Sequence, residues 1–192
     1  MQTLDSIVKD LEAIASEGGA TAVKLINPQD VVVAQWVRNK CQVGCRHFAK
    51  RFTCPPYAPT PQETAEVLKS YNQALLIEFA DRYRDKLLKE PEKTPIYLTL
   101  FNMEKAAFLA GYEKALMYEA GPCALCKECP AEKMENPNIF LKRECLRPAE
   151  ARPAMESAGI DVYSTVRRAG FELEVVRDRS EPFKCFGLLL LD

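Results

Sequence analysis

The C-terminal stretch Phe171-Glu-Leu-Glu-Val-Val-Arg-Asp-Arg-Ser-Glu-Pro-Phe-Lys-Cys-Phe-Gly-Leu-Leu-Leu-Leu191 decides the fold class. Its two apolar segments, residues 171–176 and 183–191, flank the turn-forming residues 177–182, and this arrangement predicts a terminal β-hairpin. Upstream, predicted strands alternate with predicted helices. A chain that alternates in this way and then ends in a hairpin favours an α+β fold over a pure parallel sheet. We expect a mixed sheet with helices packed on it.

The upstream segments show the helical and strand periodicities on which this expectation depends. Leu4, Ile7, Leu11 and Ile14 recur at helical spacing before Gly18. The predicted helices cover residues 4–17, 27–41, 60–71, 95–113 and 160–169. The predicted strands cover residues 20–26, 73–79 and 115–119, residues 42–61 are a predicted loop, and the charged residues 81–94 are expected to be solvated. The β-branched residues 31–33 leave a strand open as an alternative within the second helix.

Size and composition predict a single soluble domain, residues 1–192. The chain is 47% hydrophobic and 28% charged, and it is long enough to bury a core. Its net charge of −1 gives no general attraction to nucleic acid or to an anionic membrane. The first residues lack a signal-peptide pattern, and the longest apolar run, residues 187–191, is far too short to span a membrane. We therefore expect a cytoplasmic protein, in which thiols stay reduced and clustered cysteines bind metal.

The strongest chemical signal is the run Cys123-Ala-Leu-Cys126-Lys-Glu-Cys129-Pro130, followed by Cys145, within a loop spanning residues 121–148. Consecutive C-x2-C spacings wrap a short loop around a [4Fe–4S] cluster in bacterial ferredoxin-type sites. The rival interpretation is a structural zinc site, although zinc prefers two separated cysteine pairs. Simple buried thiols are the third alternative. The spacing favours an iron–sulfur cluster held by these four cysteines.

A second group of cysteines lies in a loop at residues 41–57. Cys41 and Cys45 are four residues apart and share a helix face if the helix reaches them, and Cys54 returns after the loop. Three cysteines leave a site incomplete, so a fourth ligand comes from His47, Cys185 or a bound molecule, or one iron stays open for a small ligand.

The division of ligands between the two groups stays open. A cysteine that precedes proline, such as Cys54 or Cys129, ligates the other cluster in two-cluster ferredoxins. We favour two clusters over one cluster with a separate metal. Cys185 is expected to be a small buried hydrophobe on a strand, and His47 to be exposed or hydrogen-bonded.

The loop around the second group is basic and aromatic, and no acidic residue lies between Asp30 and Glu63. These positive charges would offset a thiolate-bound cluster or attract an acidic partner protein; a merely solvated basic face is the alternative. The aromatic residues would shield a cluster from water or, alternatively, stack single-stranded nucleic acid. No nucleotide-binding glycine motif is present. The basic residues are Arg38, Lys40, Arg46, Lys50 and Arg51, and the aromatic residues are Trp36, Phe48, Phe52 and Tyr57.

In combination, these pieces resemble a known family. The order is C-x3-C at residues 41–45, Cys-Pro-Pro at 54–56, Gly-Pro-Cys-x2-Cys-x2-Cys-Pro at 121–130, Cys145, and Arg-Pro-Ala-Met-Glu-Ser-Ala-Gly-Ile-Asp at 152–161. It is similar to the predicted metal-binding proteins of domain of unknown function 2284 (DUF2284), over nearly the whole chain. The resemblance implies a cysteine-rich iron–sulfur protein of anaerobic microbes, with no settled activity. Cys185 and the Leu-Arg pair after Cys145 depart from the family pattern. Asp161 is expected to cap the following helix.

The sequence therefore predicts an iron–sulfur protein with one or two [4Fe–4S] clusters. It would transfer electrons to or from a partner redox protein, or reduce a small ligand at an open iron as an oxidoreductase component. The other hypothesis is a zinc-stabilised module that binds protein or nucleic acid through the same basic, aromatic loop, although the sequence argues against nucleic acid. Neither a membrane partner nor a nucleotide cofactor is expected.

Overall fold

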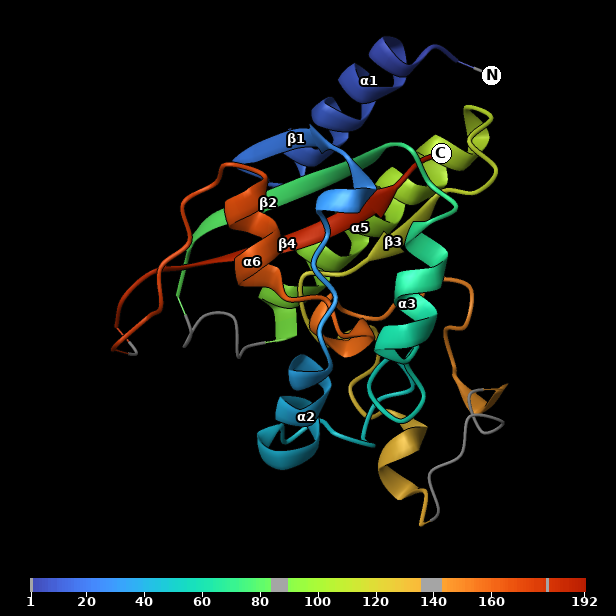
Figure 1. Ribbon diagram of the computed structural model, residues 1–192. Coiled ribbons are helices and arrows are strands. Elements are labelled where there is room, and N and C mark those ends of the chain that lie inside the picture. Colours follow the sequence, from blue (N-terminus) through green and yellow to red (C-terminus); the bar gives the residue numbers. More distant parts are fainter. Residues whose placement is uncertain (1, 84–89, 136–142, 179) are drawn as a thin grey trace.

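A computed structural model describes residues 2–83, 90–135, 143–178 and 180–192. Its centre is a four-stranded sheet in the order β1-β2-β4-β3 (Figure 1). The strands are β1 (Ala22–Ile26), β2 (Ala74–Arg82), β3 (Leu116–Tyr118) and β4 (Phe183–Leu190). The α+β class is confirmed. The sheet is antiparallel in every described strand pair rather than mixed, because β4 inserts between β2 and β3, which run in the same direction.

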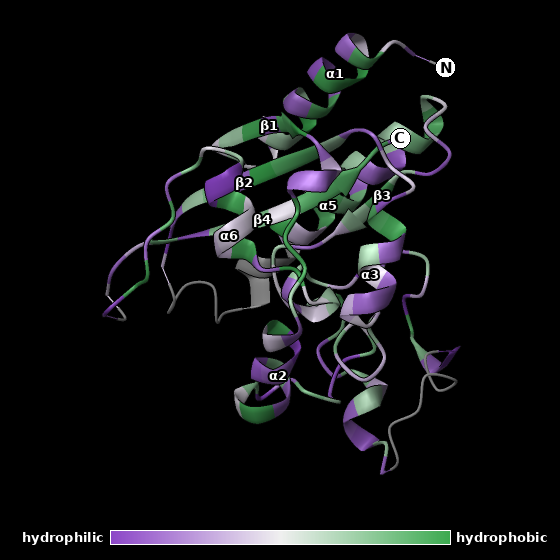
Figure 2. Cartoon of the chain, in the orientation of Figure 1, coloured by the Kyte–Doolittle hydropathy of each residue, from purple (hydrophilic) through white to green (hydrophobic). Residues whose placement is uncertain are grey.

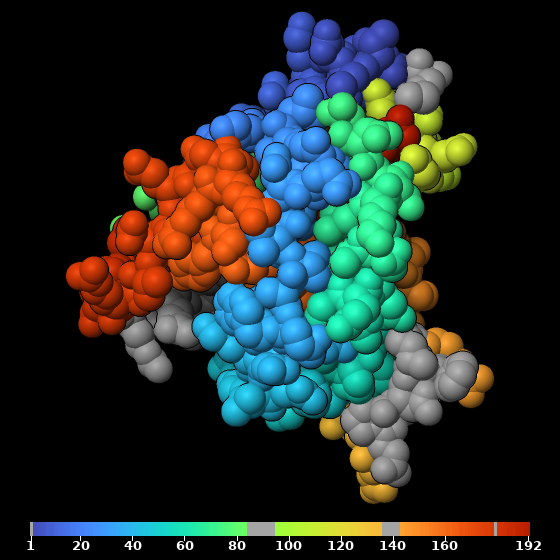
Figure 3. All heavy atoms as spheres, in the orientation of Figure 1, coloured from blue at the N-terminus to red at the C-terminus, as the bar shows by residue number. Residues whose placement is uncertain are grey.

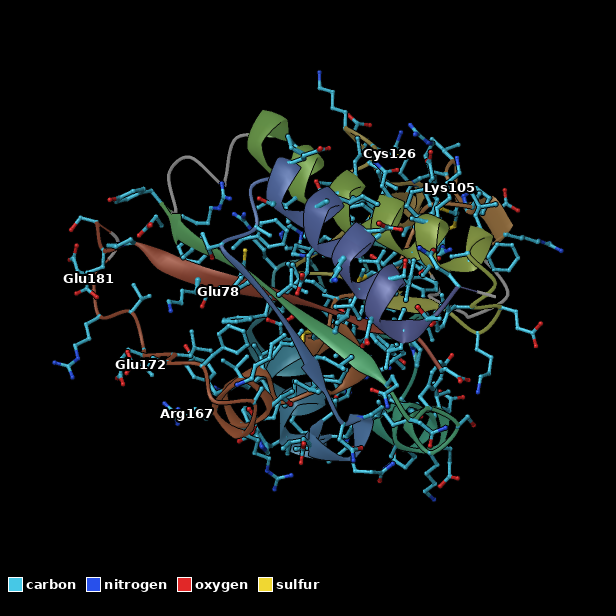
Figure 4. The ribbon with its side chains drawn as sticks, turned by 90° about the horizontal axis from the view of Figure 1, so that it is seen from above. Glu78, Lys105, Cys126, Arg167, Glu172 and Glu181 are labelled. Carbon is cyan, nitrogen blue, oxygen red and sulfur yellow. The ribbon has the colours of Figure 1, made fainter. Side chains whose placement is uncertain are left out.

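Alternating side chains of β2 build a core on each face of the sheet, which explains its continuous apolar run. Leu75, Ile77 and Phe79 pack beneath α1 (Leu4–Glu17) and α5 (Glu90–Leu109). Leu76 faces the other layer, which contains α3 (Pro61–Leu68) and α6 (Val162–Arg168). Figure 2 shows the hydrophobic strand in the middle of the molecule, and Figure 4 shows α1 and α5 side by side.

The predicted C-terminal hairpin is wrong in its first strand. Residues 171–176 contain no strand, although β4 forms as predicted. Both edges of β4 are already paired, one with β2 and the other with β3, so no edge of β4 remains for residues 171–176. This segment instead places Phe171 edge-to-face against Phe186, with ring centroids 5.6 Å apart.

Two predicted helices also differ from the structure. The helix predicted over residues 27–41 is divided into a 3-10 helix (Pro28–Asp30), an extended segment and α2 (Gln35–Gly44). The extended segment contains the β-branched residues, and Val33 bridges Ile160. The helix predicted over residues 95–113 begins earlier, since α5 starts at Glu90, and it ends at Leu109. Residues 84–89 of the charged segment lie outside the described part of the chain.

Local capping signals hold the elements beside the cysteine loops. Thr60 and Glu63 form a reciprocal capping box at α3, as their spacing predicts. Asp161 caps α6 by accepting a hydrogen bond from the Ser164 backbone nitrogen at 3.1 Å, as expected. Both loops extend below the sheet, with α2 and α3 adjacent at the surface (Figures 1 and 3). Among the described residues, no helix is both long and apolar enough to cross a membrane.

Candidate metal centre

The four cysteines of the ferredoxin-like run converge in the structure. Cys123, Cys126, Cys129 and Cys145 line one small cavity, in which the open space is about 20 Å³. The rest of the wall comprises apolar groups, Thr53 and two arginines, so sulfur is the only kind of metal ligand that lines it. This donor set fits a thiolate-ligated metal centre. Part of the connecting loop, residues 136–142, lies outside the described chain.

Burial and mutual repulsion control the charge of these thiols. Burial raises the pKa of Cys123, and the neighbouring Cys126 and Cys145 thiols raise it further. Burial also raises the pKa of Cys126, while Arg147 and Arg51 act in the opposite direction. Thiols of this kind bind metal as thiolates, so metal binding would release their protons.

The second group also comes together, at the C-terminal end of α2. Cys41 lies in the last turn and Cys45 caps the helix, with the Cys45 backbone nitrogen donating to the Cys41 oxygen at 3.3 Å. Cys54 is buried beside them, and its sulfur lies 4.0 Å from the hydroxyl of Ser157. Burial, opposed by that hydroxyl and supported by the Cys45 and Cys41 thiols, raises the pKa of Cys54 to about 12.

The two residues considered as a fourth ligand have other surroundings. Cys185 is on β4, where its sulfur faces the Phe79 carbonyl oxygen at 3.9 Å, and burial raises its pKa to about 12. The strand position is as expected, whereas the side chain is only partly buried. His47 is half-buried, and its Nε2 accepts a hydrogen bond from Arg46 at 3.3 Å.

The described residues contain no set of three histidine, cysteine, aspartate or glutamate side chains close enough to hold a single metal ion. The thiols of each cysteine group are therefore neighbours without being within coordination distance of one common ion. A multi-iron cluster separates its thiolate ligands more widely than a mononuclear site does, because each thiolate binds a different iron. The small open space means that the four side chains would have to move apart around such a cluster.

Two of the five basic residues predicted for docking instead stabilise the fold. Arg38 donates to the carbonyl oxygens of Ser157 at 2.8 Å and Pro59 at 3.2 Å, which ties α2 to the segments beneath it. Arg51 forms an ion pair with Glu132 across the two cysteine loops. Lys40 lies over the Trp36 ring, 4.9 Å from its centroid. Exposed positive charge on the second loop is therefore concentrated at Arg46 and Lys50.

Two of the four aromatic side chains of the second loop pack beside the four-cysteine cavity, whereas Trp36 is 46% exposed. Phe52 and Tyr57 are each 1% exposed and pack edge-to-face, with centroids 4.9 Å apart. Cys129 and Cys145 pack against them. This burial explains why an otherwise basic, polar loop contains large aromatic residues.

Sequence reasoning missed a buried polar network beside the first cysteine group. Arg152 donates through Nε to both carboxylate oxygens of Glu104, at 2.9 and 3.0 Å. Tyr97 donates to the Arg152 carbonyl oxygen at 2.9 Å, and its hydroxyl also bonds the Cys123 thiol. Arg152 belongs to the Arg-Pro motif, but its partners lie on a distant helix. The network fixes α5 against the chain that leaves the cysteine loop.

Comparison with known proteins gives one positive result. No curated protein and no solved structure matches the chain. A family model described as "Predicted metal-binding protein (DUF2284)" matches residues 24–191, which include both cysteine groups and every strand after β1. Because the match spans most of the chain, this protein belongs to the predicted metal-binding family DUF2284.

Proposed function

We propose that this protein is a cytoplasmic iron–sulfur protein that passes single electrons to or from a partner redox protein. Cys123, Cys126, Cys129 and Cys145 would hold one [4Fe–4S] cluster. The observation that carries the proposal is the convergence of these four thiols, in ferredoxin-like spacing, on a cavity without nitrogen or carboxylate ligands. Arg51 and Arg147 on the same wall would offset the negative charge of a thiolate-bound cluster.

We further propose that Cys41, Cys45 and Cys54 hold a second cluster or metal. The neighbouring thiols raise the pKa values of Cys41 and Cys54, which supports a shared site. Because the group has three cysteines, one iron would be open to a small ligand, and this site is where an enzymatic reduction would occur.

Metal and sulfide analysis of protein purified without oxygen tests the cluster assignment. We expect brown protein containing acid-labile sulfide, with about four irons per [4Fe–4S] cluster. Cys126→Ser should remove one component of the electron paramagnetic resonance spectrum, and Cys41→Ser should remove another. Cys185→Ser is the matched control and should keep both components, because Cys185 lies on β4 outside both groups. Colourless protein with stoichiometric zinc and no sulfide would instead support the zinc-stabilised binding module.

Charge reversal at Arg46 and Lys50 tests the proposed docking surface. Both residues are exposed beside Cys45, the exposed cysteine of the second group. The reduced double variant, Arg46→Glu with Lys50→Glu, should be oxidised several-fold more slowly by ferric EDTA, an anionic probe, at low salt. At about 1 M salt the difference should vanish, because the screening length falls to about 3 Å. Lys9→Glu with Lys69→Glu reverses the same charge elsewhere and should leave the rate unchanged. Equal rates for all three proteins would reject this docking surface.

A further inference from the structure

A second cavity, larger than that between the four cysteines, lies between α6, β4 and the chain that leads into the first cysteine loop. Its volume is about 530 Å³, within the range of ordinary small-molecule sites. Most of the wall is apolar. The apolar residues include Ile96, Val162, Leu173, Val176, Phe183 and Phe186. Transfer of a ligand's hydrocarbon or aromatic body from water into this cavity would therefore be favourable.

The polar part of the wall is acidic. Glu119, Glu156, Glu174 and Glu181 line the cavity together with one lysine, Lys184. The Lys184 ammonium is already 2.9 Å from a carboxylate oxygen of Glu78, so its charge is balanced. Figure 4 shows Glu181 on the segment that enters β4, with Glu78 on the neighbouring strand. An anionic ligand would meet net repulsion here, whereas a cation would be attracted.

Glu119 is the unusual member of this set. It is 1% exposed, and its Oε1 has no hydrogen-bond partner in the described structure. A buried carboxyl oxygen without a partner costs free energy that a ligand donor would recover. The nearby guanidinium of Arg152 is engaged by both oxygens of Glu104. Burial and the Glu104 charge raise the pKa of Glu119 well above its usual range.

We propose that this cavity binds an organic amine, with its apolar body against the wall of α6 and β4 and its ammonium group donating to Glu119. The proposal goes beyond the redox function and does not require a metal. A cationic donor satisfies the unpartnered oxygen and is also attracted by the acidic wall, whereas a neutral alcohol or an anion does not do both. Amine binding would also convert Glu119 to its carboxylate form.

Two residues of the cavity wall, Tyr97 and Glu156, act on the two cysteine groups. Tyr97 lines the cavity, and its hydroxyl bonds the Cys123 thiol. Glu156 lines another part of the wall and raises the pKa of Cys41 through its charge. Bound ligand should therefore be detectable through spectroscopic changes at either group, independently of direct binding measurements.

Calorimetry with three indoles of similar size tests the proposal on the full chain as purified. Tryptamine is the cationic probe, tryptophol its neutral alcohol counterpart and indole-3-propionate an anionic analogue. We expect tryptamine to bind at least tenfold more tightly than tryptophol, and indole-3-propionate to bind most weakly. Equal affinities for tryptamine and tryptophol, preference for the anion, or no tryptamine binding at millimolar concentration would each overturn the proposal.

Two variants locate the site. Glu119→Gln keeps the shape of the buried side chain but cannot form a carboxylate, and it should lower tryptamine affinity at least tenfold while leaving tryptophol affinity unchanged. Glu172→Gln removes a nearby carboxylate that does not line the cavity, and it should change neither affinity. Val162→Phe fills the cavity and should weaken both ligands, with a retained thermal unfolding transition showing that the variant is folded. Unchanged tryptamine binding by Glu119→Gln would reject the assigned contact.

Discussion

Glu104→Ala is expected to lower the free energy of unfolding by ~3–5 kcal/mol, because it leaves a partly buried guanidinium without its partner. Glu104 is 7% exposed and binds Arg152 through both carboxylate oxygens. It also accepts the Met117 backbone hydrogen bond at 2.6 Å, at the centre of β3. The alanine variant thus loses an ion pair and the side-chain acceptor of a buried backbone N–H group together. Urea unfolding at neutral pH measures the loss.

Glu104→Gln separates the two contributions. The amide oxygen can still accept from Met117, and removal of the Glu104 charge lowers the pKa of Glu119, which that charge raises. The variant therefore loses the ion pair but keeps the acceptor for Met117, so we expect about half of the alanine effect. Glu113→Ala removes an exposed carboxylate from the same region and should change stability by no more than about 0.5 kcal/mol. If Glu104→Ala lowers the free energy of unfolding no more than Glu113→Ala does, the contacts of Glu104 with Arg152 and Met117 do not stabilise the fold.

Elements specified by local pattern were predictable from the sequence. The helical repeat of Leu4, Ile7 and Leu11 and the glycine pair after it define α1 within one residue of the structure. The Thr60 and Glu63 capping box is likewise a property of four adjacent residues. The strand β2 was predicted because both of its faces are buried, which gives a continuous apolar run.

Elements that depend on pairing with a distant segment were not predictable from the sequence. Residues 171–176 have a strand-like composition, but a strand needs a free edge, and β4 has none in the folded sheet. The break before α2 arises because Val33 pairs with Ile160, which is 127 residues later in the chain. Neither fact is encoded in the local pattern of either segment.

The same distinction applies to the functional sites. Cysteine spacing predicted which thiols gather, because three of the four lie within one short loop. The acidic cavity was missed, since its walls come from residues 96 to 186 and no short motif joins them. Isolated glutamates at positions 104 and 119 look like ordinary surface residues until the fold buries them beside one guanidinium.

Leu100→Ala and Gly187→Ala are expected to destabilise the protein separately and to compensate in part when combined. Leu100 is fully buried, and its truncation should cost ~2–5 kcal/mol by leaving a cavity. A Cβ added to Gly187 would lie 2.6 Å from Leu100 Cδ1 and 2.8 Å from Cδ2. Gly187→Ala should therefore cost ~1–3 kcal/mol by overpacking.

The double variant provides the decisive measurement, because alanine at position 100 removes both clashing methyl groups. The combined loss of unfolding free energy should be smaller than the sum of the single losses by about 1 kcal/mol or more. Val166→Ala is the matched control, since Val166 is fully buried in the core on the other face of the sheet. Its combination with Gly187→Ala should be additive within about 0.5 kcal/mol. Strict additivity of the Leu100 pair would show that close contact between α5 and β4 does not require glycine at position 187.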